Sequence, residues 1–544
     1  MASLKSIILE NIIIALNKKG DISPSFLARL KRKAAKKFRH QFVTNSHLIK
    51  AYHNLVKNKT INQSAKIENL LRRRQIRTLS GVAVITVLTR PYPCPGQCIF
   101  CPKEPGMPKS YLKNEPAAHR AFLTKFDPYT QVTVRLKALA DNGHPIDKLE
   151  LIVLGGTWSA YPESYQYWFI KECHKAVNEF PAKSSAFAKT SADKQNLQKL
   201  LKKEQWKNET TKHRIIGITL ETRPDYINLE EIKKMRDLGC TRVELGAQTV
   251  YDDVLKKNQR GHTVIQTIAA TKLLKNAGFK INYHMMLNLP GSSILRDRQM
   301  FIELFSNPDF QPDLLKIYPC AVLKTAQLYT LWQAKKYRPY TEKQLVSLLL
   351  AIKKNIPPYV RIQRIIRDIP ADDIVAGSKT SNLRQLINNL GTKQCQCIRC
   401  REIRGQYSIK DKIKFFRHDY PASDGQEIFL SFASPDQKKL YALLRLRINS
   451  QNTEILPVLQ GAALIRELHT YGQLINIKTK NQKPKTDSAA QHIGLGKRLM
   501  TAAEKIVKEE TRLKKIAVIS GVGVREYYKK LGYKPEDEYM VKNV

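Results

Sequence analysis

The chain of 544 residues is too long for one hydrophobic core, because cores stop growing at roughly 250–300 residues, so it is expected to form several domains. A hydrophobic fraction of 42% with 8% aromatic residues excludes collagen-like, coiled-coil and wholly disordered classes. The 93 Lys and Arg against 47 Asp and Glu leave a formal charge of +46, which favours a polyanionic partner, nucleic acid first.

No stretch approaches the roughly 18 uninterrupted apolar residues of a membrane helix. The apolar run at residues 7–14 is broken by Glu10 and Asn11 and lacks a small-residue cleavage site, which predicts an amphipathic helix rather than a secretion signal. Six of the nine cysteines fall in two tight clusters, a pattern that indicates metal binding in a reducing compartment. We therefore expect a cytoplasmic protein without membrane association.

Residues 1–80 carry 18 Lys and Arg against three acidic residues. Apolar residues such as Phe26, Leu27 and Leu30 recur at helical spacing between them, which predicts helices with a packed side and a basic side. A solvated surface is the alternative, although solvated surfaces normally mix both signs of charge. The candidate RNA-binding residues are Lys31, Arg32, Lys33, Lys36, Lys37, Arg72, Arg73 and Arg74.

From residue 81 the pattern changes to apolar, β-branched runs that alternate with helical segments. The predicted strands are residues 82–88, 149–154, 215–220, 242–245, 280–287 and 314–319. This alternation predicts a parallel (βα) sheet, closed or partly closed into a barrel over residues 81–385, with its chemistry at the carboxyl ends of the strands. Residues 182–213 are polar and weakly periodic, and are expected to be an insertion between two barrel units.

Cys94, Cys98 and Cys101 follow the first predicted strand at C-x3-C-x2-C spacing. Three thiolates in one short loop suit three irons of a [4Fe–4S] cluster and leave the fourth iron open to substrate. A structural zinc is the alternative, but zinc prefers four protein ligands. The loop resembles that of the radical S-adenosylmethionine superfamily.

The second predicted strand ends in Gly155-Gly156-Thr157, where the bare backbone permits close approach of a ligand. This segment resembles the superfamily's glycine motif, which implies contact with the methionine amino group of S-adenosylmethionine. Further candidates for cofactor binding at strand ends are Glu221, Arg223 and Gln248, with Glu244 and His284 also at this rim. Each could instead be a satisfied polar residue of the barrel.

A second α/β fold is expected over residues 416–544, opening with strands at 428–432 and 441–448. Gln491, Gly494, Leu495, Gly496 and Lys497 precede an amphipathic helical run at 498–508. Glycines at a helix N-terminus let backbone N–H groups converge on a pyrophosphate. The pattern resembles the acetyl-CoA turn of GNAT acetyltransferases, and a capping glycine turn is the alternative.

The same resemblance gives roles to two neighbouring segments. Glu467, Leu468, His469 and Thr470 have the look of the strand beside the pantetheine, and Tyr527 and Tyr528 lie on a later predicted helix.

A second cysteine group, Cys395, Cys397 and Cys400, lies in the predicted linker at residues 386–415. Three cysteines within six residues would hold a tetrahedral zinc if one more ligand came from elsewhere. Cys320 is the candidate fourth ligand and His418 is the alternative.

The segments 217–226, 260–263 and 517–523 resemble the family of the catalytic subunit of Elongator, from about residue 80 to the C-terminus. This resemblance implies carboxymethylation of the tRNA wobble uridine at carbon 5, using acetyl-CoA, S-adenosylmethionine and a 5′-deoxyadenosyl radical. It also implies that Lys148, Tyr527 and Tyr528 are catalytic, that Lys148 contacts acetyl-CoA with residues 467–470, 495–497 and Tyr528, and that the basic helices bind the anticodon stem-loop.

The short spacing of the first cysteines and the second cysteine group resemble prokaryotic members, which implies independence from accessory Elongator subunits. Two other functions compete with this interpretation. A protein lysine acetyltransferase leaves the first cysteine loop unexplained, and a methylthiotransferase leaves the acetyl-CoA turn unexplained.

Overall fold

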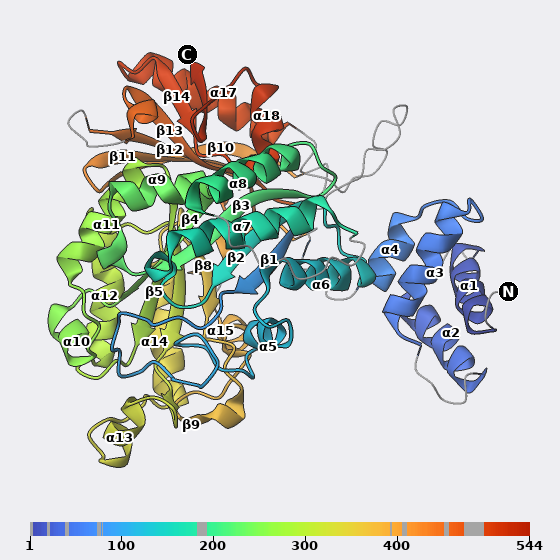
Figure 1. Cartoon of the computed structure of the whole chain (residues 1–544), viewed down its shortest axis with the longest axis horizontal. Helices are drawn as coiled ribbons and strands as arrows, with labels where there is room; N and C mark the ends of the chain where they lie inside the picture. The colour runs from blue at the N-terminus through green and yellow to red at the C-terminus, as the bar shows by residue number, and fades with distance from the viewer. Residues whose placement is uncertain are drawn as a thin grey trace.

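The structure is a computed structural model that describes residues 4–18, 22–37, 43–72, 78, 80–181, 193–391, 394–404, 411–450, 456–472 and 494–544. Figure 1 shows three parts: blue N-terminal helices to one side, a central barrel, and an orange-to-red C-terminal sheet against one end of the barrel. Within the described residues, no helix has the length and apolar character needed to cross a membrane.

The N-terminal helices form a unit with its own core. They are α1 (Leu4–Lys18), α2 (Pro24–Lys37), α3 (Asn45–Lys57) and α4 (Ala65–Leu71). Ile13, Leu16, Leu48 and Tyr52 are buried among them, whereas Arg32 is exposed. The predicted amphipathic helices are therefore confirmed, with a packed side and a basic side.

The central sheet has seven parallel strands in the order β1-β2-β3-β4-β5-β6-β8. Their bounds are β1 (Val82–Leu88), β2 (Lys148–Leu154), β3 (Arg214–Thr222), β4 (Cys240–Gln248), β5 (Lys280–Leu287), β6 (Leu314–Pro319) and β8 (Arg361–Ile365). The first and last strands of this order do not pair, so the barrel is open on one side. All six predicted strands are confirmed, and β8 is an additional strand.

Helices cover the outer face of this sheet. They are α5 (Pro116–Leu123), α6 (Pro128–Asp141), α7 (Glu163–Asn178), α8 (Lys194–Asn208), α9 (Leu229–Asp237), α10 (Asp252–Lys257), α11 (Val264–Asn276), α12 (Ile294–Ser306), α13 (Leu328–Gln333), α14 (Glu342–Lys354) and α15 (Leu383–Asn389), with short 3₁₀ turns η2 (Trp158–Ala160), η3 (Pro224–Tyr226) and η4 (Ala371–Asp373). A small antiparallel pair, β7 (Val322–Leu323) and β9 (Ile374–Ala376), follows the barrel strands. The predicted insertion contains α8, which packs beside α7 within the helical layer.

The C-terminal sheet also has seven strands, in the order β10-β11-β12-β13-β14-β16-β15. They are β10 (Lys414–Ala422), β11 (Gly425–Ala433), β12 (Leu440–Asn449), β13 (Ala462–Thr470), β14 (Lys515–Val518), β15 (Lys534–Glu536) and β16 (Tyr539–Asn543), joined by α17 (Leu495–Glu510), α18 (Arg525–Lys529), η6 (Pro457–Leu459) and η8 (Val522–Val524). Only the β13–β14 pair within this sheet is parallel among the described strands. A second α/β fold is thus confirmed, and it begins with β10, before the first strand predicted.

The C-terminal sheet joins the barrel at the amino ends of the barrel strands. Arg466 of β13 forms an ion pair with Asp313, which immediately precedes β6. At the start of β3, the turn at residues 521–523 packs so closely that a Cβ on Gly521 would overlap the carbonyl group of Ile216. The carboxyl ends of the barrel strands, where the predicted cofactor loops lie, are therefore at the far end from this junction.

Candidate active sites

A single pocket at the carboxyl ends of the barrel strands gathers the first cysteine group. Cys94, Cys98 and Cys101 all line it, together with Gly156 and Thr157 from the loop after β2. The Sγ of Cys94 lies 3.7 Å from Oγ1 of Thr157, so the two loops meet. The structure thus brings the cysteine loop and the glycine motif together at one pocket.

The environment of Cys98 favours a thiolate. Arg260 donates a hydrogen bond from Nη1 to the Cys98 Sγ over 3.3 Å. A hydrogen bond from Cys101, opposed by burial and aided by the Arg260 charge, lowers the pKa of Cys98 to about 5. Because the thiolate is the form that binds metal, three cysteines in a cationic pocket fit an iron–sulfur cluster.

The glycine pair presents bare backbone to the same pocket. Gly155 has φ +138° and Gly156 has φ +96°, conformations that L side chains rarely adopt. A Cβ on Gly155 would also overlap the Thr89 hydroxyl. Gly156 lines the pocket, so a ligand can approach its main chain without a side chain in the way.

Three further predicted cofactor residues, Glu221, Arg223 and Gln248, line this pocket too. Arg223 forms an ion pair with Asp225 over 2.8 Å, and its buried Nη1 has no hydrogen-bond partner among the described residues. Gln248 has φ +69°, a strained conformation for a residue with a side chain. An open donor and local strain at a pocket wall both favour a ligand site.

The second predicted site lies at the N-terminus of α17. Gly494 is the N-cap with φ +78° and provides no side-chain cap, so the first-turn amides remain available. A Cβ on Gly496 would lie 3.3 Å from the Tyr527 hydroxyl and 3.6 Å from Cγ2 of Thr470. The fold thus brings Gly496, Thr470 and Tyr527 together. Gln491 lies outside the described residues.

Strand alternation separates the four predicted residues of β13. Leu468 and Thr470 lie near Gly496, whereas the Glu467 carboxylate forms ion pairs with Arg445 over 2.8 Å and Lys280 over 3.6 Å. The His469 ring lies 4.3 Å from that of Tyr471. Glu467 and His469 therefore face away from the α17 turn.

The two tyrosines of α18 also differ. Tyr527 is 39% exposed, while Tyr528 is 7% exposed and packs with Tyr533 in the core. Tyr527 is thus the more accessible of the pair.

Lys148, which the family resemblance assigns to acetyl-CoA, does not lie near the glycine pair. It opens β2, opposite Arg214 of β3, and Gly155 follows the other end of the same strand. Seven residues at about 3.3 Å each separate them by roughly 20 Å. Burial and the charge of Arg214 lower the pKa of Lys148. This lysine belongs to the barrel end that meets the C-terminal sheet.

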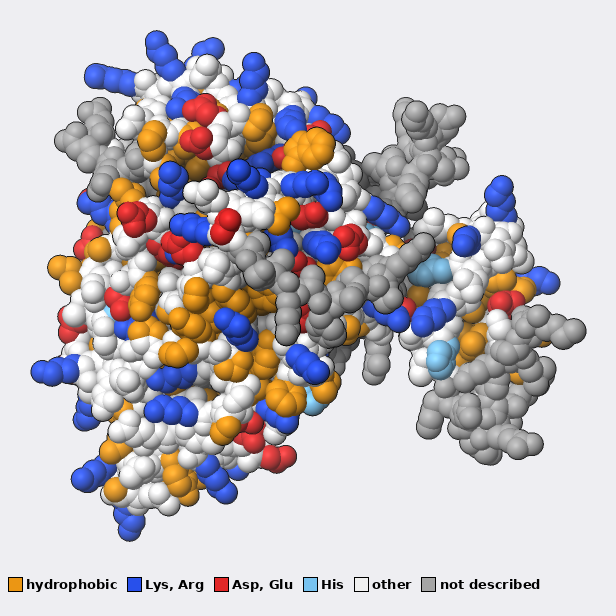
Figure 2. All heavy atoms as spheres, in the orientation of Figure 1, with side chains coloured by type: hydrophobic (Ala, Val, Ile, Leu, Met, Phe, Trp, Pro, Cys, Tyr) orange, Lys and Arg blue, Asp and Glu red, His pale blue; other side chains and the backbone are white. Residues whose placement is uncertain are grey.

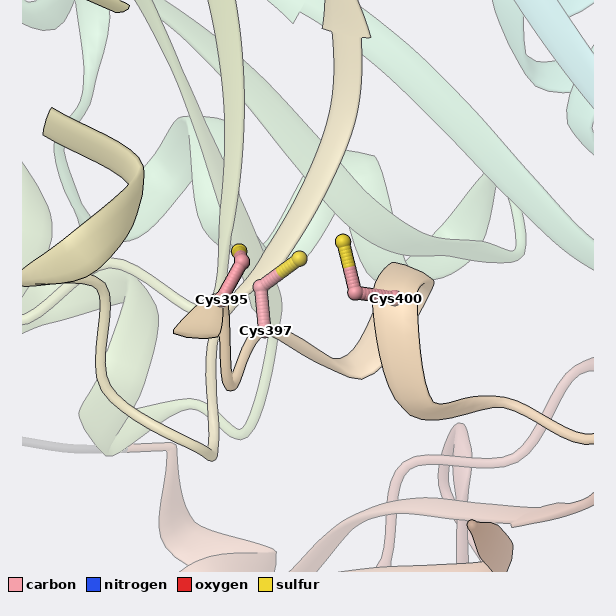
Figure 3. Close-up of side chains that lie close together, drawn as sticks. All are labelled: Cys395, Cys397 and Cys400. Atoms are coloured by element: carbon pink, nitrogen blue, oxygen red, sulfur yellow. The ribbon is translucent and has the colours of Figure 1, made fainter. Parts of the chain in front are cut away.

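The second cysteine group forms a compact site beside β8 (Figure 3). The sulfur atoms of Cys395, Cys397 and Cys400 all lie within 4.8 Å of one another. Hydrogen bonds from Cys395 and Cys400 lower the pKa of Cys397. Three converging sulfur atoms fit a thiophilic metal such as zinc.

Neither proposed fourth ligand joins this site. Cys320 follows β6 at the opposite end of the barrel and packs with Cys98, Phe100 and Val322. His418 lies on β10, and its ring stacks on that of Tyr359, with 5.6 Å between the ring centroids. Among the described residues, no fourth Cys, His, Asp or Glu comes within the same 4.8 Å.

The predicted RNA-binding residues have different environments. Arg32 and Lys33 are exposed on α2, but Lys31 hydrogen-bonds to Asn45, and Arg72 donates to the Gly143 carbonyl group over 2.8 Å. Arg72 thus ties the helical unit to the barrel. Figure 2 shows Lys and Arg side chains spread over the face of the molecule that it draws. Arg73, Arg74 and the side chains of Lys36 and Lys37 lie outside the described part of the chain.

A buried charged cluster on the inner face of the barrel was only partly anticipated. Glu244 and His284 were rim candidates, but Lys316, which contacts Glu244 and lies 3.3 Å from Glu221, was not singled out. Lys316 could have been recognised in the sequence as a lysine inside the apolar run Leu314-Leu315-Lys316-Ile317. A charge there needs a buried partner.

An open parallel barrel with a cysteine-lined pocket at its carboxyl end defines the radical S-adenosylmethionine class. A sequence profile of the Radical SAM superfamily matches residues 92–304, and the profile of the Radical_SAM C-terminal domain matches residues 312–390. The chain belongs to the family that contains tRNA uridine(34) acetyltransferase and Elongator complex protein 3.

Three similar proteins illustrate this membership. The tRNA uridine(34) acetyltransferase of Methanocaldococcus infernus is 45% identical over 87% of this chain and 88% of its own. Elongator complex protein 3 of Homo sapiens is 39% identical over 87% and 86%. A solved structure of the archaeal Methanocaldococcus infernus Elp3 with an N-terminal deletion has a TM-score of 0.71 and 41% identity, covering 86% of this chain and 100% of that one.

Proposed function

We propose that this chain modifies the wobble uridine of tRNA at carbon 5, using the acetyl group of acetyl-CoA to build a carboxymethyl group. The observation that carries the proposal is the presence of two sites in one chain. One is the cysteine pocket at the carboxyl ends of the barrel, and the other is the open helix N-terminus of the C-terminal sheet. The similar proteins are named as uridine(34) acetyltransferases of tRNA, which supports the acyl-transfer class.

The chemistry requires both sites. Carbon 5 of uracil is a weak nucleophile and an acetyl methyl group is a very weak acid, so acid–base catalysis alone has little effect on joining them. When bound, the cluster and S-adenosylmethionine supply a 5′-deoxyadenosyl radical that can take a methyl hydrogen.

In this proposal Cys94, Cys98 and Cys101 hold the cluster. The S-adenosylmethionine site would be formed by Gly155, Gly156, Thr157, Glu221, Arg223 and Gln248. The unpartnered Nη1 of Arg223 would donate to an anionic group of this ligand, since a buried guanidinium N–H without an acceptor is costly.

The acetyl-CoA pyrophosphate would bind the first-turn amides of α17, at Leu495, Gly496 and Lys497. Its pantetheine would pass Leu468 and Thr470, with Tyr527 beside it. Glu467 would hold β13 against the barrel through Lys280, His469 would pack on Tyr471, and Tyr528 would support Tyr527 from the core. Lys148 would contact acetyl-CoA where the two sheets meet, and the acetyl group would then have to pass along the barrel to the cysteine pocket, roughly 20 Å away at the other end of β2.

The basic helices α1–α4 would bind the anticodon stem-loop, because their Lys and Arg side chains can neutralise its phosphates. A zinc ion at Cys395, Cys397 and Cys400 would fix the junction beside β8. The enzyme would act in the cytoplasm without accessory subunits.

Nucleoside analysis of tRNA after anaerobic incubation with reduced enzyme tests this function. Carboxymethyluridine should require both acetyl-CoA and S-adenosylmethionine. Acetylated lysine on protein without any change in tRNA would favour the lysine acetyltransferase, and a thiolated base formed without acetyl-CoA would favour a methylthiotransferase.

A further inference from the structure

Four charged side chains on adjacent barrel strands form one connected cluster on the inner face of the sheet. Glu221 of β3 stands in register with Glu244 of β4, and His284 of β5 with Lys316 of β6. The Nε2 of His284 lies 2.7 Å from Oε2 of Glu244 and 3.8 Å from Oε1 of Glu221. Lys316 contacts both carboxylates. The sequence places these groups together because each lies on the inner face of its strand.

This cluster belongs to the cysteine pocket. Glu221, Glu244 and His284 line the same cavity as Cys98 and Gly156. Glu244 is fully buried, while the His284 side chain retains 15% exposure. The imidazole is therefore the most exposed of these three side chains and can contact a ligand in the pocket.

The cluster is not built to hold a metal ion. Ligand atoms of Glu221, Glu244 and His284 lie within 4.8 Å of one another, a spacing that would suit a cation. However, the Lys316 ammonium already contacts both carboxylates, and a second cation would face it as a like charge.

Cations surround the Glu244 carboxylate. Lys316 contacts it, and Arg242, itself paired with Glu150, lies 3.8 Å away. Although burial opposes it, the charge of Lys316 and the hydrogen bond from His284 hold the pKa of Glu244 well below its usual range. Glu244 therefore stays ionised and accepts a hydrogen bond from Nε2 of His284.

Three other polar side chains lie around this cluster. The Tyr318 ring meets the imidazole edge to face at 5.5 Å, and burial raises the pKa of Tyr318. Tyr111 donates to Glu221 over 2.7 Å, and Arg364 lies on the facing strand β8. Imidazole differs from these groups in carrying a ring nitrogen that can hold a free lone pair.

The hydrogen bonds also assign the tautomer. Because Nε2 faces two carboxylates, it carries hydrogen and donates to Glu244. The second nitrogen, Nδ1, has no hydrogen-bond partner among the described residues and carries the free lone pair. A base whose other nitrogen is held by a buried carboxylate is the arrangement of a general base.

We propose that His284 accepts the proton that leaves carbon 5 of the uracil during its substitution. This inference rests on the proposed function. In the substitution, the acetyl-derived carbon and the C5–C6 double bond each contribute one electron to the new bond at C5, which leaves one unpaired electron on C6. The C5–H bond then breaks and its proton goes to Nδ1 of His284. One electron of that bond restores the double bond with the C6 electron, and the other leaves to a one-electron acceptor of the iron–sulfur class.

The test follows two isotopes in one anaerobic reaction of the reconstituted holoenzyme. Its tRNA carries tritium at C5 of uridine, and its acetyl-CoA carries a deuterated methyl group. In His284→Gln, tritium release to water should fall by about 10²-fold or more, as expected for loss of a general base. Deuterium in 5′-deoxyadenosine and equilibrium binding of S-adenosylmethionine should stay within about threefold of wild type. Added imidazole should restore tritium release to His284→Ala.

The surface substitution His119→Gln on α5 is the matched control and should release tritium like wild type. Tritium release from His284→Gln at the wild-type rate would overturn the assignment. An equal loss of S-adenosylmethionine binding and tritium release, or His284→Ala that imidazole does not restore, would show a binding or packing role instead. A wild-type enzyme that forms no modified uridine would overturn the proposed function itself, and this assignment with it.

Discussion

Arg466 and Asp313 form a two-point ion pair across the junction of the two sheets. Nη2 of Arg466 lies 2.6 Å from Oδ2 of Asp313, Nη1 lies 3.0 Å from Oδ1, and both side chains are fully buried. Arg466 also donates to Glu427 over 2.8 Å, and Asp313 accepts from the Ile281 amide. Such a buried pair, held by two hydrogen bonds, fixes the C-terminal sheet on the barrel.

Removing one partner of this pair should destabilise the protein strongly. Asp313→Ala leaves the Arg466 guanidinium buried without its main counter-charge, so the free energy of unfolding should fall by about 3–5 kcal/mol. Urea denaturation followed by fluorescence measures the change. The exposed pair of Asp436 and Lys438 is the control, because Asp436→Ala should leave the free energy of unfolding close to that of wild type. Equal effects at the two sites would refute a structural role for the buried pair.

Substitution at Gly496 should weaken acetyl-CoA binding and leave the barrel unaffected. A valine there would press on the Tyr527 hydroxyl and the Thr470 methyl group. Such crowding costs about 1–3 kcal/mol, which is roughly a tenfold to hundredfold rise in Kd by calorimetry. The iron–sulfur absorbance of the same variant should be unchanged. Thr501→Val, at an exposed position of the same helix α17, should keep acetyl-CoA affinity.

The strands with long apolar runs could be predicted from sequence, and the facing of individual side chains could not. The bounds of β1, β5 and β6 match the predicted ranges, because apolar residues predominate in each of them, as is typical of strands covered on both faces. The strand β8, Arg361–Ile365, was not predicted, because two arginines and a glutamine interrupt its apolar pattern at the open edge of the barrel.

The same limit explains the outcome at the candidate sites. A motif of consecutive residues such as Glu467–Thr470 cannot all face one ligand, since successive strand side chains point to opposite faces. Lys148 is near Gly155 in sequence but lies at the other end of β2. Cys320 has the right chemistry for the second cysteine group, but its position after β6 depends on the barrel topology.

Neutralising Arg32 and Lys33 should reduce the salt dependence of tRNA binding. Both side chains are exposed on α2 and free to meet phosphates, unlike Lys31, which is bonded to Asn45. Each lost phosphate contact lowers the slope of log affinity against log salt by roughly 0.7–0.9. Filter binding at several salt concentrations measures the slope. Unchanged slopes in Arg32→Ala/Lys33→Ala, matching the exposed control Lys335→Ala/Lys336→Ala, would restore the solvated-surface interpretation.

The buried His174 should make the protein less stable in mild acid. Burial lowers the pKa of His174 to about 4, from an ordinary value of 6.5, and neither ring nitrogen has a partner among the described residues. Between these values the unfolded chain binds a proton that the folded chain does not, so stability falls as pH drops through that window. The slope is about 1.4 kcal/mol per pH unit.

In urea denaturation from pH 7 to pH 4, His174→Gln should flatten this slope by about one proton. His119→Gln on the surface should leave it as in wild type. A His174→Gln protein with the wild-type slope would show that other groups cause the acid sensitivity.

The destination of the acetyl methyl hydrogen tests the central claim most directly. Methyl-deuterated acetyl-CoA is incubated anaerobically with reduced enzyme, S-adenosylmethionine and tRNA, with Cys98→Ala as the variant that should form no 5′-deoxyadenosine. The account predicts deuterium in the 5′-deoxyadenosine made by wild-type enzyme, as mass spectrometry would detect. Unlabelled 5′-deoxyadenosine formed alongside deuterated carboxymethyluridine would contradict it.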